Sequence, residues 1–340
     1  MATIYDIAKK CGVSASTVSY VLSGNGDARR IAADTQLRVL QAAEALGYQR
    51  RGGAPETPRS SAEPMITVYY PKRDFAVSLV SMLEGVNQAI DSEIFPIRLN
   101  ISTYEIGGLG QKKELWSASG PDAAIIVSPT PKDLHLLEEK KTLTPTVLFY
   151  RELDGYSSVN TDHKTAALLA ANHALDSGGH DIALVTNPFR QYAISSRGQF
   201  MLDAFLAAGV NMQDRVFFSD NSIDAGYELG WEMVRKNKLS KVILCVYDMV
   251  ALGIMSALNE AGIHIGEDVK ILATSTSPQY LFSRSYPPMT VVDLHSQEVA
   301  MKSMTLALHL ATRQITGEQH LIVQPSIIYR QSCPLIPHLG

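Results

Sequence analysis

Hydroxyl and aromatic side chains near the N-terminus have the spacing of one exposed helix face. In the segment 14–22 the apolar residues Val18, Val21 and Leu22 form a stripe that would face inward. The residues on the opposite side are Ala15, Ser16, Ser19 and Tyr20. Small polar groups and a phenol can hydrogen-bond to the edges of DNA bases or to phosphates. The spacing therefore predicts a helix that buries one side and offers the other to solvent or to a DNA groove.

The residues before this helix predict a first helix and a tight turn that position it. Thr3 precedes an apolar run and has Asp6 three residues later, which is a capping-box arrangement. The residues at i, i+3, i+4 and i+7 of that run are Ile4, Ile7, Ala8 and Cys11. Gly12 would end the first helix and Ser14 would cap the second. A third helix is predicted from the spacing of Val39, Ala43 and Leu46.

The opening segment MATIYDIAKKCGVSASTVSYVLSG resembles the N-terminal domain of the lactose-repressor/galactose-repressor family of bacterial transcription regulators. A shorter pattern of this kind would also fit an ordinary helical hairpin. The resemblance implies that the second helix enters the major groove, with base contacts from Ala15, Ser16 and Tyr20. It assigns phosphate contacts to Thr3, Ser14, Thr17, Ser19 and Thr35.

The chain departs from the family pattern at two positions of this domain. Tyr20 stands where the family usually has Arg, so the common bidentate contact to guanine is not available. Ala32 stands where a Ser usually caps the third helix, a loss of about 1 kcal/mol.

Charge and composition divide the 340 residues into a basic N-terminal domain, a linker and an acidic body. Residues 1–61 carry a net charge of +3 and the remainder −7, which suits a DNA-binding module attached to a sensor. We predict a helix-turn-helix domain over 1–48 and a hinge over 49–64, QRRGGAPETPRSSAEP, which is rich in Gly, Pro and Ser. The usual hinge-helix start Pro-Asn and its Leu are missing there.

Residues 65–335 alternate short β-branched runs with helical stretches. One series contains MITVYY, AVSLVSMLEGVNQAI, FPIRLNI, AAIIVS and PTVLFY; the other contains HDIALVT, SKVILCV, a helix from Met249 to Ala261 and VKILATS. Two such series predict an α/β core with two doubly wound parallel sheets. The resemblance implies a two-lobed periplasmic-binding-protein-like core. We predict lobe 1 over 65–160 and 293–322, and lobe 2 over 161–292 and 323–335.

Several side chains at predicted strand ends are candidates for an effector site between the lobes. Arg197 starts a helix, where a cation opposes the helix dipole, so it is either solvated or bound to a ligand. Asp248 follows the strand KVILCV and is either a helix N-cap or a ligand group. The family uses residues at both positions for its effector. Further candidates, each of which could equally be a core or loop residue, are Asp74, Phe75 and Tyr150.

The same region departs from the family in three small polar groups. Two further effector candidates, Ser275 and Tyr247, stand at positions where the family has other residues: Ser275 replaces a carboxylate, and Tyr247 stands where Asn or Thr is usual. Tyr150 likewise stands where Asp is common. These changes disfavour an ordinary free hexose and leave a modified sugar, a nucleoside or another metabolite open.

Nothing in the sequence points to catalysis, a metal or a cofactor. There is no nucleophile elbow, zinc-protease motif or phosphate-binding loop, and Cys11, Cys245 and Cys333 form no CxxC pair. No apolar stretch reaches membrane-spanning length and no signal region is present, so we expect a cytoplasmic protein without a membrane partner.

These features predict a transcriptional regulator, specifically a repressor, that binds near-palindromic double-stranded operator DNA as a homodimer. A small-molecule effector between the two lobes would control its DNA affinity. The alternative is a small-molecule receptor, for instance for a sugar, without DNA regulation. A single head of net charge +3 offers few contacts, so two heads on matching half-sites are expected.

Overall fold

The computed structural model describes residues 3–22, 31–45, 63–72, 77–93, 96–187 and 196–336. Contacts divide the chain into a unit of residues 1–60 and a unit of residues 61–340, called here the head and the core. The predicted hinge over 49–64 lies outside the described residues except for its last two positions. Asp74 and Phe75 also lie outside them.

The described residues of the head form a bundle of three helices. They are α1 (Ile4–Cys11), α2 (Ala15–Leu22) and α3 (Ala33–Ala45). Thr3 and Asp6 form the predicted capping box at the start of α1, and Gly12 ends the helix in the left-handed conformation. Each helix contributes one fully buried side chain to the shared core, namely Ile7, Val18 and Val39. The predicted helix-turn-helix is therefore confirmed.

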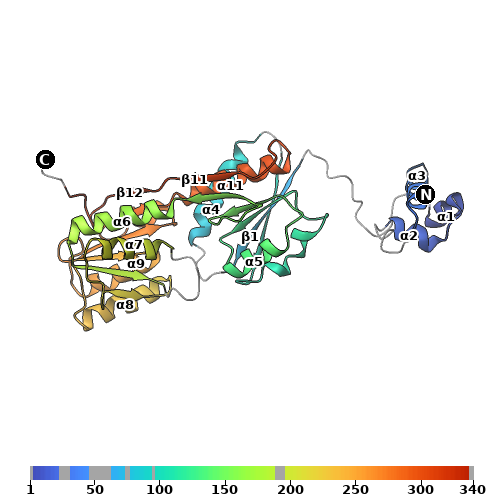
Figure 1. The fold of residues 1–340 in the computed structure, drawn as a ribbon. Helices are drawn as coiled ribbons and strands as arrows, with labels where there is room; N and C mark the ends of the chain where they lie inside the picture. Colours follow the sequence, from blue (N-terminus) through green and yellow to red (C-terminus); the bar gives the residue numbers. More distant parts are fainter. Residues whose placement is uncertain are drawn as a thin grey trace. The chain divides into compact units, whose positions relative to one another are not determined.

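The core contains two six-stranded sheets, each covered by helices (Figure 1). The strand order is β11-β5-β4-β3-β1-β2 in the first sheet and β12-β10-β9-β8-β6-β7 in the second. In both orders the early strands lie toward one edge and the later strands toward the other, as in a doubly wound fold. We call the two halves lobe 1 and lobe 2.

Lobe 1 is built from the first βα series and two later elements. Its strands are β1 (Met65–Pro71), β2 (Arg98–Tyr104), β3 (Ala123–Val127), β4 (Thr146–Phe149), β5 (Ser157–Thr161) and β11 (His320–Val323). Its helices are α4 (Val77–Asp91), α5 (Pro131–Glu139) and α11 (Ser296–Ala311), with short 3-10 turns η1 (Leu109–Gln111) and η2 (Lys113–Trp116). Helices α4 and α11 pack on one face of the sheet, over an apolar cluster that includes Ile66, Val86 and Met304.

Lobe 2 repeats this plan with the second series. Its strands are β6 (Ile182–Thr186), β7 (Val216–Phe218), β8 (Val242–Cys245), β9 (Lys270–Ser275), β10 (Thr290–Asp293) and β12 (Ser326–Ile328). Its helices are α6 (His163–Gly178), α7 (Ser196–Ala207), α8 (Ile223–Arg235), α9 (Asp248–Glu260) and α10 (Gln279–Ser283). Two apolar clusters fill its interior, one beneath α6 and α7 and the other beneath α8 and α9.

One edge of the second sheet differs from the predicted all-parallel arrangement, because β12 pairs with β10 antiparallel. The cause is the path of the chain. Strand β11 runs parallel to β5 toward the lobe boundary, and two residues later the chain continues as β12 (Figure 1). The strands of lobe 2 also end at that boundary, so a strand that enters from lobe 1 meets them in the opposite direction.

The chain crosses the lobe boundary in three places that are hydrogen-bonded to one another. The crossings follow β5, β10 and β11. Thr161 Oγ1 donates to the carbonyl of Val323 at 3.0 Å, and the Asp162 N–H donates to the same carbonyl at 3.2 Å. His295 Nε2 lies 2.9 Å from Ser326 Oγ. Among the described residues, no helix is long and apolar enough to span a membrane.

Candidate DNA-binding and effector sites

The outward face of α2 carries hydroxyls and no charge. Ser14 caps the helix as predicted, since its hydroxyl accepts the N–H of Thr17 at 3.0 Å. The same oxygen lies 2.8 Å from the hydroxyl of Ser16 and 2.7 Å from that of Thr17. Ser16 and Tyr20 are exposed, while Ala15 and Ser19 are half-buried. This face can therefore offer hydrogen bonds without an ion pair.

The remaining predicted DNA contacts lie in other parts of the head. Thr3 is exposed at the N-cap of α1. Thr35, in the first turn of α3, is half-buried, and its hydroxyl accepts a hydrogen bond from Arg38 at 3.4 Å. Tyr5 was not predicted as a contact, yet its side chain is 77% exposed on α1 beside Thr3.

Three of the predicted effector residues meet at the lobe boundary together with a histidine that was not predicted. We call Tyr150, His163, Arg197 and Tyr247 the arginine cluster. Arg197 donates from Nη1 to His163 Nδ1 at 3.2 Å, and its guanidinium lies 5.7 Å from the centre of the Tyr247 ring. The rings of Tyr150 and His163 are 5.8 Å apart. The cluster therefore joins the end of β4 to the starts of α6, α7 and α9.

Strand geometry explains why these side chains converge. Strands β4 and β5 are parallel neighbours, so Tyr150 and His163, which follow them, lie at the same edge of the first sheet. Tyr150 has a positive φ of 63° and donates its backbone N–H to the carbonyl of Val159 at 3.0 Å. Arg197 stands in the first turn of α7, as predicted, but is only 6% exposed.

The surroundings of His163 keep its imidazole neutral. Burial lowers the pKa of His163 to about 3, and the positive charges of Arg197 and Arg151 act in the same direction. A guanidinium can only donate hydrogen bonds, so Nδ1 is the acceptor and the ring proton is on Nε2. His163 therefore holds Arg197 without contributing a negative charge.

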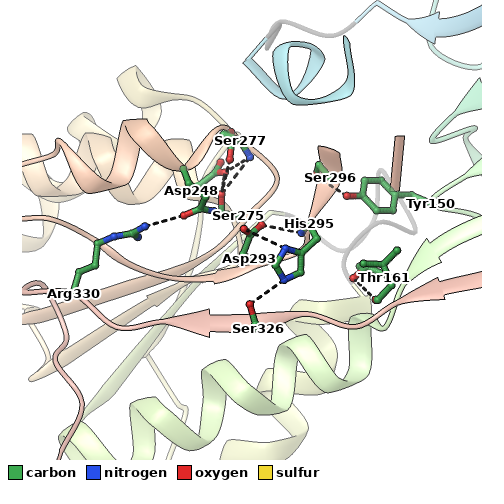
Figure 2. A network of polar contacts seen from close by, with 12 residues as sticks. Tyr150, Thr161, Asp248, Ser275, Ser277, Asp293, His295, Ser296, Ser326 and Arg330 are labelled. Atoms are coloured by element: carbon green, nitrogen blue, oxygen red, sulfur yellow. Dashed lines mark hydrogen bonds and ion pairs between the residues drawn. The ribbon is translucent and has the colours of Figure 1, made fainter. Parts of the chain in front are cut away.

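Asp248 and Ser275 also meet, but in a closed set of hydrogen bonds that Figure 2 shows at the end of the second sheet. We call Asp248, Ser275, Thr276 and Ser277 the aspartate cluster. Asp248 Oδ2 accepts from the Ser275 hydroxyl at 2.9 Å and from the backbone N–H groups of Thr276 and Ser277 at 3.1 and 3.2 Å. Its Oδ1 accepts from the N–H of Met249 at 2.8 Å. Asp248 is 3% exposed and Ser275 is fully buried.

The prediction that Asp248 could be a helix N-cap is wrong. Tyr247 is the N-cap residue of α9, without a side-chain cap bond, and Asp248 is the first helical residue. Strands β8 and β9 are parallel neighbours, so the loop after Ser275 lies beside the start of α9. The carboxylate of Asp248 therefore fastens that loop.

A third set of polar contacts links the crossings of the chain beside both clusters (Figure 2). Asp293 accepts the backbone N–H of His295 at 2.8 Å, and its second oxygen lies 3.5 Å from His295 Nδ1. Burial raises the pKa of Asp293. Tyr150 and Ser296 share a hydrogen bond of 2.6 Å between their hydroxyls, which ties the end of β4 to the start of α11. Burial also raises the pKa of Tyr150, so its phenol stays protonated.

Family models match both parts of the chain. A model described as "Bacterial regulatory proteins, lacI family" matches residues 3–51, and one described as "Periplasmic binding protein-like domain" matches residues 171–333. Together they match more than half of the chain. The chain belongs to the LacI family. The resemblance inferred from the helix-turn-helix segment and the core is thus confirmed.

Curated LacI-family relatives align over almost the whole length. The chain is 25% identical over 347 residues to the HTH-type transcriptional repressor MelR of Bacillus subtilis, covering 98% of each. It is 23% identical over 337 residues to the HTH-type transcriptional repressor PurR of Pasteurella multocida, again covering 98% of each. This LacI-family protein is a DNA-binding transcriptional regulator.

Solved structures of LacI-family proteins share the fold. A regulator from Clostridium acetobutylicum superposes with a TM-score of 0.74 at 24% identity, covering 78% of this chain and 99% of that one. The regulator CelR in complex with cellobiose gives a TM-score of 0.67 at 21% identity, covering 98% of this chain and 100% of that one. The lac repressor dimer bound to operator and the anti-inducer ONPF gives 0.64 at 20% identity, covering 98% of this chain and 99% of that one.

The sequence did not single out His163. It stands at the first position of α6, directly after the N-cap Asp162. A histidine that follows the carboxyl end of a parallel strand can lie at a ligand edge. Its partner Arg197 is 34 residues away in the chain, so only the fold could join them.

Proposed function

We propose that this LacI-family regulator is a repressor that binds near-palindromic operator DNA as a homodimer and changes its DNA affinity when a small molecule binds between the two lobes. The observation that supports control by a small molecule is the arginine cluster. It unites side chains from lobe 1 and lobe 2 around a buried cation at the boundary that the chain crosses three times. A ligand bound there would contact both lobes.

Binding alone does not switch a regulator. The effector must have different affinities for the two arrangements of the lobes, and the difference sets how far operator affinity can change. The hydrogen bonds between crossings, such as that of His295 with Ser326, are the contacts that such a rearrangement would alter. The CelR–cellobiose complex and the lac repressor dimer bound to operator and an anti-inducer have the same fold, which supports this proposal.

The proposal includes the sites in the head. The exposed side chains of Ser16 and Tyr20, with Ala15, would contact base edges, and the hydroxyls of Thr3, Ser14, Thr17, Ser19 and Thr35 would contact phosphates. It also places the protein in the cytoplasm, where operator DNA lies, and gives it no catalytic role, since the relatives are repressors.

The test uses the full chain and a randomised duplex DNA library. Wild type should select a palindromic sequence, with an affinity that falls linearly on a log–log plot against salt concentration. Tyr20→Arg should change the selected sequence, because each base contact contributes about 1–3 kcal/mol of discrimination. Thr17→Ala, the matched control, should weaken binding to all sequences alike.

Two outcomes would contradict the proposal. Equal effects of both variants across the library would remove the assignment of α2 to base recognition. Absence of salt-sensitive duplex binding in wild type, with metabolite binding retained, would favour the alternative of a small-molecule receptor without DNA regulation.

A further inference from the structure

The described partners of Arg197 carry no negative charge. Among the described residues its two contacts are the neutral imidazole of His163 and the face of the Tyr247 ring. Its Nε is buried and has no hydrogen-bond partner in the described part of the chain. With an exposed fraction of 6%, the guanidinium is also largely removed from water. A buried cation in this condition is costly unless an anion joins it.

Nearby carboxylates are committed to other groups. Asp248 accepts four hydrogen bonds, from Met249 and from the loop over Ser275–Ser277. Asp293 accepts the backbone N–H of His295, and its second carboxylate oxygen lies 3.5 Å from Nδ1 of the same residue. Both carboxylates act on the phenol of Tyr150 through their charges, as does Arg197, so all lie in one region. Neither makes an ion pair with Arg197 within the described residues.

Another arginine of lobe 2 shows the contrast. Arg215 donates to the carboxylate of Asp181 and to the hydroxyl of Ser240 at 3.0 Å, and its side chain is 37% exposed. The cation that water reaches therefore has a carboxylate, whereas the buried cation has only neutral partners in the part of the chain that the structure describes. No described residue supplies the counter-charge at Arg197.

We propose that the effector carries an oxyanion, a carboxylate or a phosphate, and that Arg197 binds it with the donors that His163 leaves unused. This deepens the proposed function and rests on it. A guanidinium presents parallel N–H groups that match two oxygens of either anion, and such charge-assisted pairs are strong where water is excluded. His163 is a positioning residue, because it fixes the guanidinium by accepting from one nitrogen. The rings of Tyr150 and Tyr247 offer apolar surface to the rest of the ligand.

A neutral sugar fits these residues less well. Its hydroxyls could accept hydrogen bonds from Arg197 but would leave the buried positive charge unbalanced. Both carboxylate oxygens of Asp248, which could otherwise accept hydrogen bonds from sugar hydroxyls, already accept from the protein: Oδ2 from the loop over Ser275–Ser277 and Oδ1 from the N–H of Met249.

The first experiment uses inorganic phosphate as the probe on the full chain. The melting temperatures of wild type, Arg197→Gln and the matched control Arg215→Gln are measured in phosphate and in chloride at equal ionic strength. We expect phosphate to stabilise wild type and Arg215→Gln and to leave Arg197→Gln unchanged, since a ligand that binds only the folded state raises its melting temperature. Phosphate bound by the head affects all three alike and cancels. An equal rise in all three overturns the proposal.

The second experiment separates the two anions and the neutral ligand. Glucose, gluconate and glucose 6-phosphate are titrated calorimetrically into wild type and Arg197→Gln. The proposal is supported if gluconate or glucose 6-phosphate binds wild type and its affinity falls about ten- to a hundredfold in the variant. Which of the two ligands binds shows whether the anion is a carboxylate or a phosphate. If glucose binds more tightly than either anion, and its affinity falls by the same factor in Arg197→Gln, the proposal of an anionic effector is overturned. The proposed function is not affected by that result. Duplex DNA binding by both proteins, measured alongside, tests that function independently and verifies folding.

Discussion

The aspartate cluster and the arginine cluster contain adjacent residues of the chain, Asp248 and Tyr247, yet they differ in how completely their charged groups are hydrogen-bonded. The carboxylate of Asp248 accepts from one side-chain hydroxyl and three backbone N–H groups. The guanidinium of Arg197, stacked on the ring of Tyr247, has one hydrogen-bond acceptor among the described residues and a buried Nε without a partner.

This difference separates structural from functional use of a buried charge. A charge whose hydrogen bonds are all made within the protein stabilises the fold, and its loss leaves buried donors unpaired. A buried charge that lacks a partner of opposite charge lowers the stability of the free protein. A ligand that supplies the missing partner raises that stability. We therefore propose that Asp248 and Ser275 support the architecture of the site, and that Arg197, His163, Tyr150 and Tyr247 contact the effector.

The largest effect is expected from Asp248→Ala. The change leaves the N–H groups of Met249, Thr276 and Ser277 without the acceptor that they share, so the free energy of unfolding should fall by about 2–4 kcal/mol. Urea denaturation of the full chain measures it. Asp248→Asn, which keeps one acceptor oxygen, should lose about half as much. If Asp248→Ala retains wild-type stability but loses effector binding, the two clusters have been assigned the wrong way round.

Arg197→Gln should show the opposite pattern. Its removal leaves a single acceptor, His163 Nδ1, unpaired, so we expect a change in unfolding free energy of no more than about 1 kcal/mol. The affinity for the effector should fall about ten- to a hundredfold, and operator affinity without effector should stay near wild type. Calorimetry and a gel-shift assay check the two halves. A collapse of effector-free operator binding would place Arg197 in the fold instead of the site.

A smaller effect is expected from Tyr150→Phe, which tests the link between the clusters and the crossings. The variant loses the 2.6 Å hydrogen bond between Tyr150 and Ser296 but keeps the ring, so stability should fall by about 1 kcal/mol. Because this bond ties β4 to the start of α11, the effector concentration that half-saturates the DNA response should also shift. Ser296→Ala, which removes the other hydroxyl, should reproduce both changes; a wild-type result from either variant would show that the bond has no role.

The smallest effect is a difference between two pH profiles. The pKa of His163 is about 3 in the folded chain, below its ordinary value, because of burial and then the charges of Arg197 and Arg151, with Asp162 opposing them. The unfolded chain therefore binds a proton that the folded chain does not, and stability should decrease as the pH falls from about 6.5 toward 3. Above that window the contribution of His163 is constant.

His163→Gln isolates this contribution. Glutamine can still accept from Arg197 but does not titrate, so its stability should decline less steeply than that of wild type across the same window. Other groups, such as Asp293, whose raised pKa acts with the opposite sign, are common to both proteins and cancel in the comparison. Parallel profiles would mean that the pKa of His163 is not lowered in the folded chain.

Much of the molecule followed from local sequence patterns. The capping box of Thr3 with Asp6, the turn at Gly12 and the apolar stripe of α2 join residues within a few positions of one another, so helical periodicity alone determines them. The alternation of β-branched and helical segments likewise predicted both sheets, because each parallel strand needs a crossover helix.

The use of each side chain at the lobe boundary was decided only by the tertiary structure. Tyr247 and Asp248 are adjacent in sequence, yet the ring of Tyr247 lies against Arg197, whereas the carboxylate of Asp248 accepts hydrogen bonds from a loop 27 to 29 residues away. The antiparallel pairing of β12 depends on the direction from which the chain re-enters lobe 2, which strand propensity does not encode. Sequence patterns determine local hydrogen bonding and which faces are buried, whereas the partner of a buried charge depends on which distant strand ends the fold brings together.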